Sequence, residues 1–166
     1  MNLWLDSYDD IFSDFDSRHF MKRRISEDFL HELHIEIKYM EQYASDMVLL
    51  LPGQQRNEEA EEIIKTSLSN FFTIQFNFHR DTCRKKRNNG ILLLSIGIII
   101  MVLNSWLSFY WSATFPALGL KVLLEPAGWF LLWAALDFLF YDYAGLKKEK
   151  NFFRQLAEMH IHFKSS

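Results

Sequence analysis

Among the carboxylates in the most apolar part of this sequence, two have positions that could do chemistry. Glu125 is followed by Pro126, and Asp137 lies about three helical turns further along. An ionised side chain inside a membrane costs about 3 kcal/mol on insertion scales unless it meets water or a partner. Asp137 is therefore a candidate for an ion pathway or proton relay, or else a carboxylate bonded to neighbouring helices or near the interface. Asn104 is a weaker intramembrane polar candidate.

Two apolar runs around these residues are each long enough to cross a bilayer as a helix. They span about Ile91–Trp111 and about Leu123–Tyr143, and about twenty helical residues cover a hydrocarbon core of about 30 Å. The connecting loop, 112–122, has Lys121 as its one charged residue. Basic residues instead cluster at the other ends of both runs: Arg80, Arg84, Lys85, Lys86, Arg87, Lys147, Lys148, Lys150 and Arg154. The charge distribution predicts a two-pass integral membrane protein with both termini cytoplasmic, as in a bacterial inner membrane.

Outside these runs, the pattern predicts an all-α fold with a cytoplasmic helical bundle. Ser26 begins a helix whose apolar spacing extends to Leu51, and Pro52-Gly53 ends it. Asn57 caps a second helix that runs towards the first apolar stretch. We expect an acidic aromatic segment over 1–25 and a cytoplasmic helical hairpin or coiled-coil bundle over 26–89. A transmembrane hairpin over 90–144 and a cytoplasmic C-terminal helix over 145–166 would follow.

Composition and motifs exclude several classes of function. The net charge of -3 does not favour nucleic-acid binding, and the single cysteine, Cys83, excludes an intrachain disulfide framework. His31 and His34 are three residues apart and could share a metal with Glu27, but the sequence places no further ligands, so we favour surface or packing histidines. No phosphate-binding glycine loop, nucleophile elbow or HExxH motif is present. We therefore expect no enzyme and no cofactor.

A helical projection groups apolar residues below Glu125. If this face lines a symmetric axis, Glu125 side chains from several copies form a ring at the outer mouth, as in cation-selective pores. A hydrophobic constriction would then consist of Leu132, Leu136 and Leu139 or Phe140. The simpler alternative is that Glu125 only begins the second membrane helix, because proline is well tolerated in a first turn.

The string Leu123-Leu124-Glu125-Pro126-Ala127-Gly128-Trp129-Phe130 resembles the Trp-Asp-x-x-Glu-Pro signature of the mitochondrial calcium uniporter pore subunit family. In that family, the signature opens the second membrane helix. The resemblance implies that Glu125 binds the permeant metal ion, calcium or another divalent cation, and that Pro126 and Trp129 support the selectivity ring. Lys121 and Val122 replace the family's tryptophan and aspartate, so a second acidic ring is absent.

These observations predict an oligomeric membrane cation channel with Glu125 as its selectivity site. One two-span hairpin cannot enclose a water-filled path, so we expect a homotetramer or homopentamer in the lipid bilayer. The alternative is a non-enzymatic, membrane-anchored interaction or scaffold protein whose cytoplasmic helices bind a partner. The sequence leaves open the permeant ion, the stoichiometry, the gating stimulus, any accessory protein and the role of the acidic N-terminal segment.

Overall fold

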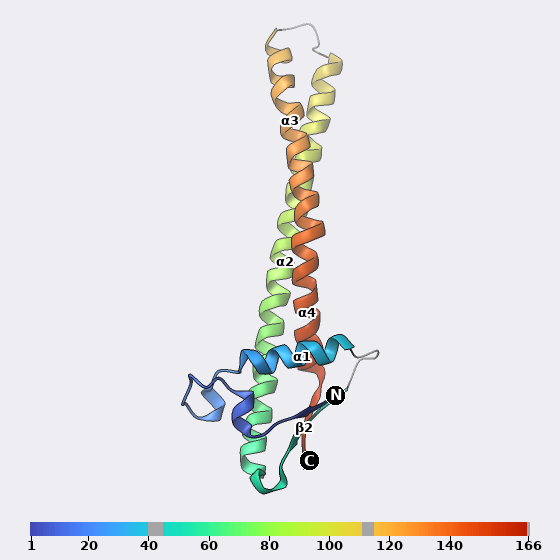
Figure 1. Cartoon of the computed structure of the whole chain (residues 1–166). Helices are drawn as coiled ribbons and strands as arrows, with labels where there is room; N and C mark the ends of the chain where they lie inside the picture. The colour runs from blue at the N-terminus through green and yellow to red at the C-terminus, as the bar shows by residue number, and fades with distance from the viewer. Residues whose placement is uncertain (40–44, 111–114, 166) are drawn as a thin grey trace. The chain divides into compact units, whose positions relative to one another are not determined.

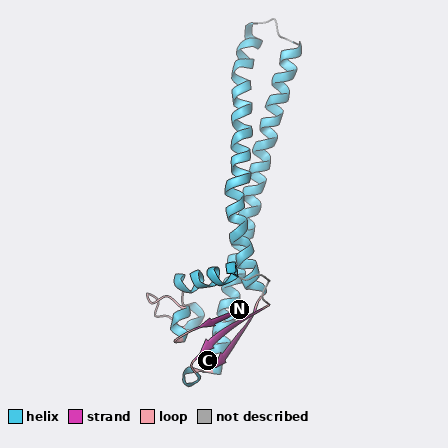
Figure 2. Ribbon diagram, turned by 45° about the vertical axis from the view of Figure 1, so that its right-hand side comes forward, coloured by secondary structure: helices cyan, strands magenta, loops and turns pink. Residues whose placement is uncertain are grey.

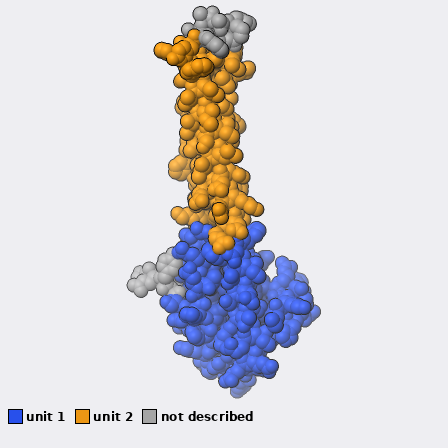
Figure 3. Space-filling model, turned by 180° about the vertical axis from the view of Figure 1, so that it is seen from behind, with its two compact units in different colours: residues 1–78, 150–166 blue, residues 79–149 orange. Residues whose placement is uncertain are grey.

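The computed structural model describes residues 1–39, 45–110 and 115–165 of the chain (Figure 1). The chain forms two compact units (Figure 3): unit 1 is Met1–Phe78 with Lys150–Ser166, and unit 2 is His79–Glu149. The expected helical class is confirmed for most of the described residues. Unit 1 also contains a three-stranded sheet, which we did not expect from the sequence.

The sheet of unit 1 is parallel throughout, with its strands in the order β1-β2-β3 (Figure 2). β1 is Asn2–Trp4, β2 is Asp46–Leu51 and β3 is His160–Ser165. The expected helical extension over Met47–Leu51 is therefore wrong. A short run of apolar residues fits a buried strand as well as a helix, and here pairing with two other strands decides between them.

The described residues form four α-helices: α1 Glu27–Tyr39, α2 Glu58–Tyr110, α3 Phe115–Asp137 and α4 Tyr143–Glu158. A π-helical segment, Phe138–Asp142, joins α3 to α4. Short 3-10 turns occupy Tyr8–Ile11, Phe20–Lys22 and Gly53–Gln55. The C-terminal helix was expected to continue to the end of the chain, but it ends at Glu158 and β3 follows.

The expectation of a helical hairpin over 26–89 is wrong, because β2 lies within this range. This strand separates α1 from α2, so Pro52-Gly53 joins a strand to a helix. Asn57 caps α2 as expected, because its Oδ1 accepts hydrogen bonds from the Glu59 and Ala60 N–H groups at 3.0 and 3.2 Å. The start of the second helix was thus readable from local chemistry, whereas the strand before it was not.

The core of unit 1 combines one face of the sheet with helices from both ends of the chain. Its buried apolar side chains include Leu3, Leu49, Phe163, Phe29, Leu33, Ile64, Leu68, Phe72, Phe153 and Leu156. On α2 the buried residues recur every four positions, which places them on one side of the helix. The first and last strands are thereby held in the same unit.

Unit 2 consists of the later part of α2, α3 and the start of α4. The outer loop expected over 112–122 is wrong for residues 115–122, which are helical; residues 111–114 lie outside the described residues. Two helices, Glu58–Tyr110 and Gly119–Glu158, are long and apolar enough to cross a membrane. Only 17% and 11% of their most apolar windows are buried, so most of these apolar side chains face outwards.

Candidate functional site

Glycines set the register between α2 and α3 in unit 2. A Cβ added to Gly90 would lie 2.7 Å from Leu139 Cδ2, and one added to Gly97 would lie 3.2 Å from Leu132 Cδ2. Seven residues forward on α2 therefore correspond to seven residues backward on α3 and its continuation. The two helices are antiparallel, and they approach so closely at these points that larger side chains would not fit without displacement.

Small or polar residues recur every seven positions along this contact, which we call the seam. On α2 these residues are Cys83, Gly90, Gly97 and Asn104, and on α3 they are Lys121, Gly128 and Ala135; all of them are buried or half-buried. A repeat of seven keeps one face of each helix towards the other. The seam is apolar or small through its middle and becomes polar at Asn104 and Lys121.

Asn104 lies opposite Glu125. A Cβ on Gly128 would lie 2.7 Å from Met101 Cγ, and three further residues in each direction lead to Asn104 and Glu125. The Asn104 Oδ1 is buried and has no hydrogen-bond partner among the described residues. A buried amide oxygen left unpaired costs about 1–3 kcal/mol. A hydrogen-bond donor brought to the Asn104 Oδ1 would therefore stabilise the helix pair.

Glu125 lies inside α3 and not in its first turn. It is ten residues after Phe115, which corresponds to about 15 Å along the axis. Pro126 is inside the helix, so the carbonyl of Val122 lacks its usual helical donor. The prediction that Glu125-Pro126 opens the second helix is wrong, because the apolar residues before it are helical too. The Glu125 side chain is exposed on the outside of the helix pair.

The other residues of the predicted pore divide between two surfaces. Leu132 and Leu139 pack against Gly97 and Gly90 of the same chain, so they belong to the seam. Three residues are exposed, like Glu125: Trp129 at 54%, Leu136 at 39% and Phe140 at 70%. The structure therefore does not bring the full predicted constriction set onto one outward face.

Asp137 lies near the charged end of the helix pair. By the same register it is opposite Leu92, two residues beyond Gly90. One turn closer to the charged end, Lys86 Nζ lies 3.7 Å from Asp142 Oδ2 and 4.7 Å from the centre of the Phe138 ring. Asp137 therefore lies nearer to the charged end of the helix pair than Glu125 does.

Lys121 is a site residue that we placed in a loop and the structure places in a helix. It is half-buried on α3, one turn before Glu125, and by register it lies opposite Ser108. The Ser108 Oγ donates to the Asn104 carbonyl at 2.8 Å, so this hydroxyl is already used. Lysine, asparagine and glutamate thus lie within two turns of each other on the helix pair. The seven-residue spacing from Gly128 was the signal that would have placed Lys121 in the seam.

No cluster of three or more metal-ligating side chains occurs within the part of the chain that the structure describes. His31 is exposed, and the His34 ring stacks on Phe152 with 3.4 Å between ring centres. One ring nitrogen of His34 also lies 3.2 Å from the Leu30 carbonyl oxygen. These contacts describe a packing role for His34, and Glu125 contributes a single carboxylate per chain.

The acidic N-terminal segment uses several of its carboxylates inside unit 1. Asp16 is buried and accepts hydrogen bonds from Arg18 Nε and Nη2, both at 2.8 Å. These bonds and the Arg24 N–H hold the pKa of the Asp16 carboxyl well below its usual range. The Asp10 side chain accepts from the Asp6 and Ser7 N–H groups at 2.7 and 3.0 Å. The spacing of the acids did not reveal these partners.

The geometry of unit 2 can accept an ion or a polar partner at one level of an otherwise apolar surface. Its polar groups are the exposed Glu125 carboxylate, the buried Asn104 Oδ1 and the amine of the half-buried residue Lys121. Comparison with models of protein families, with curated proteins and with solved structures finds no match to this chain.

Proposed function

We propose that the protein is a homo-oligomeric, two-span membrane protein that conducts cations past a ring of Glu125 side chains. The observation that supports this proposal is the exposure of Glu125 on an apolar helix surface, ten residues into α3. In a single hairpin this carboxylate would face lipid, which is costly. Several copies around a water-filled axis hydrate it and give it cations to attract.

The connectivity of unit 1 supports a hairpin that enters and leaves the membrane on one side. β2 precedes the helix pair in sequence and β3 follows it, yet the two strands pair over six residues each. An even number of crossings satisfies this pairing. The basic residues at the open end of the pair, including Arg84 and Lys147, favour the cytoplasmic side for unit 1 and both termini.

The choice of ion rests on Glu125 and Lys121 together. A ring of carboxylates favours cations over anions. The Lys121 amine, one turn away in the seam, lowers the attraction for divalent cations more than for monovalent ones, because the repulsion scales with ion charge. We propose cation conduction on the basis of Glu125, and we propose calcium or another divalent cation only on the basis of the resemblance to the uniporter family.

Flux through reconstituted protein tests the proposal. We expect Glu125→Gln to lower cation flux into liposomes at least tenfold, because the amide keeps the shape of the side chain but removes its charge. Asp137→Asn, the same change at the charged end of the pair, is the matched control and should leave flux within about twofold of the unsubstituted protein. Native mass measurement in detergent should show at least four chains for both variants.

Equal flux through the Glu125→Gln variant and the unsubstituted protein would contradict a selectivity role for Glu125. A monomer or dimer that conducts no cation would instead favour the second candidate, a membrane-anchored scaffold. The face of the sheet opposite the core supports that candidate: Trp4 is 61% exposed and its register partner Leu50 is half-buried. Parallel sheets are usually covered on both faces.

A further inference from the structure

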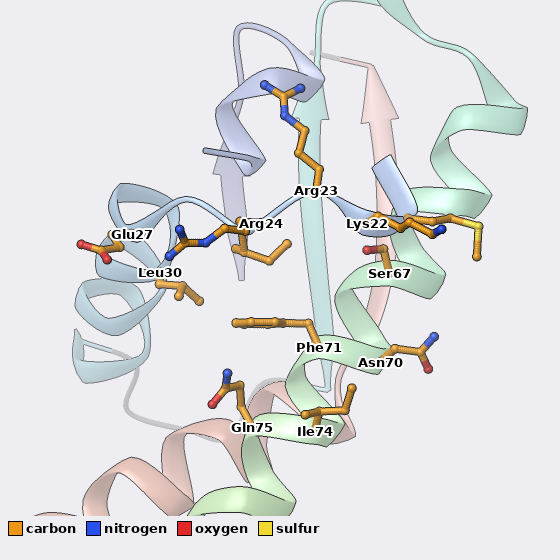
Figure 4. Close-up of a pocket in the computed structure, with 12 residues that line it drawn as sticks. Lys22, Arg23, Arg24, Glu27, Leu30, Ser67, Asn70, Phe71, Ile74 and Gln75 are labelled. Atoms are coloured by element: carbon orange, nitrogen blue, oxygen red, sulfur yellow. The ribbon is translucent and has the colours of Figure 1, made fainter. Parts of the chain in front are cut away.

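A cavity of about 510 Å³ is formed entirely by residues of unit 1. This volume falls within the roughly 300–1,000 Å³ range of small-molecule sites. Its walls come from the segment 21–25, the first turn of α1 and one side of α2 (Figure 4). We propose that this cavity binds a nucleotide through Arg24, Glu27, Phe71 and Gln75. The proposal is independent of cation conduction by unit 2.

The segment that presents Arg24 is held by hydrogen bonds of its own backbone. The Arg24 N–H donates to Asp16 Oδ2 at 2.9 Å, and the Arg24 carbonyl accepts from the Ser13 N–H at 2.8 Å. The charge of Asp16 is already matched by Arg18, which binds both of its carboxylate oxygens at 2.8 Å. The side chain of Arg24 is therefore available for a ligand while its backbone is fixed.

Arg24 is the cation best placed to bind an anionic group in this cavity. Its side chain is exposed, points towards the space beside α1 (Figure 4) and has no ion pair among the described residues. Arg23 points away, because it pairs with Asp9 and lies 5.5 Å from the centre of the Phe12 ring. Lys22 also lines the cavity and adds positive charge. A guanidinium can bind phosphate through two parallel hydrogen bonds.

Phe71 and Gln75 offer a planar surface and an amide one helical turn apart. The half-buried Phe71 ring is held by T-shaped contacts with Phe72 and Phe153, with ring centres 5.8 and 6.5 Å apart. It extends across the cavity towards Leu30 (Figure 4). A nucleobase can stack on such a ring. The Gln75 amide can donate to and accept from the edge of the base.

Glu27 distinguishes a nucleotide from a simple anion. It lines the same cavity from the first turn of α1. A carboxylate here weakens the binding of free phosphate, but it accepts hydrogen bonds from ribose hydroxyls, as acidic residues do in dinucleotide-binding folds. In this proposal Arg24 binds the phosphate and Glu27 the ribose of one nucleotide. Phe71 stacks on the face of its base, and Gln75 binds the edge.

Calorimetric titration of the full-length protein in detergent with adenosine monophosphate tests this proposal. Adenosine and inorganic phosphate serve as probes that each lack part of the ligand, and both should bind at least tenfold more weakly. Arg24→Ala should weaken binding of adenosine monophosphate at least tenfold and leave adenosine binding unchanged. Lys38→Ala, which removes an exposed cation of α1 outside the cavity, should change neither.

Phe71→Leu should weaken adenosine and adenosine monophosphate alike, with a near-ultraviolet circular dichroism melt to show that the variant folds. The proposal is overturned if none of adenosine, guanosine, cytidine and uridine monophosphate binds at millimolar concentration. It is equally overturned if the Arg24→Ala variant binds adenosine monophosphate as tightly as the unsubstituted protein does. It is also overturned if the cavity binds only phosphatidylglycerol, presented in nanodiscs, and no nucleotide. The phosphate that Arg24 binds would then belong to a lipid headgroup.

Discussion

At the scale of single residues, Glu61 shows what a carboxylate needs in order to be buried in this protein. It is 3% exposed and accepts hydrogen bonds from Arg56 Nε and Nη2, both at 2.9 Å, and from the Tyr8 hydroxyl at 3.1 Å. The bonds from Arg56 contribute most to the lowered pKa of the Glu61 carboxyl, and they outweigh its desolvation. Burial, and next the bond to Glu61, raise the pKa of Tyr8. Glu125 has no comparable set of partners among the described residues, which is why we assign it an intermolecular role.

The Glu61 cluster predicts how the stability of unit 1 depends on pH. Because the pKa of the Glu61 carboxyl is lower in the folded protein than its ordinary value of 4.5, its contribution to stability is present above that value. The contribution is lost as the pH falls through the lower, folded pKa. Glu61→Gln should destabilise the protein by about 1–3 kcal/mol at neutral pH and flatten the acid limb of the melting temperature against pH.

Glu62→Gln is the matched control for this prediction. Glu62 is the next residue on α2; it is exposed, and its carboxylate pairs with Lys65 at 2.6 Å. Its substitution should change stability by less than about 0.5 kcal/mol. Circular dichroism melts of both variants at about pH 3 to 7 give the comparison. If the Glu61→Gln and Glu62→Gln variants melt alike at every pH, Glu61 and its partners do not stabilise the protein.

At the scale of elements, the seam gives the two apolar helices close contacts that would still hold them together in lipid, where we propose that they lie. Within lipid, side chains gain little by leaving one apolar environment for another, so close packing decides which helices associate. Gly90 and Gly97 allow Leu139 and Leu132 to lie against the backbone of α2. Larger residues at these positions would separate the helices and also shift Asn104 relative to Glu125.

Gly90→Leu should therefore lower the melting temperature of the detergent-solubilised protein by several degrees. Its Cβ would lie 2.9 Å from Leu139 Cγ, which cannot rotate away as easily as a methyl group. Gly145→Leu is the control, because nothing lies within 4 Å of a Cβ at Gly145. That variant should keep or slightly raise the melting temperature, since leucine favours helix over glycine. A Gly90→Leu protein as stable as the Gly145→Leu protein would show that the seam does not need its glycines.

The sequence predicted helices better than strands because helical spacing is visible over many residues. α2 and its Asn57 cap were readable, whereas β2 is a short apolar run with no alternation of its own. β3 did offer a signal: Ile161 and Phe163 alternate with polar neighbours, as in a strand with one buried face. The depth of Glu125 was not predictable, because it depends on whether the apolar residues before Pro126 continue the helix.

At the scale of the whole molecule, the helix pair is an insertion between two strands of one sheet. α2 leaves unit 1 after β2, and α4 returns to it before β3. Both ends of the pair are therefore tied to the same folded unit, and unit 1 lies on one side of any membrane that the pair enters. This constraint comes from strand pairing and is separate from the distribution of basic residues.

Cysteine labelling of intact cells tests this topology. In a Cys83→Ser background, Gly119→Cys near the start of α3 should react with a membrane-impermeant maleimide added from outside. Lys164→Cys on the exposed face of β3 should react only after permeabilisation. Labelling of both positions from the same side would contradict two membrane crossings.

The pairing of β2 with β3 also sets the order in which the protein is completed during synthesis. The ribosome makes β2 early, then both apolar helices, and only afterwards the residues of β3. Until that last strand emerges, one edge of β2 has no partner and the apolar residues of α4 are absent from the core. Unit 1 therefore reaches its final form only after the apolar segments have left the ribosome, and until then an unpaired strand edge is open to aggregation.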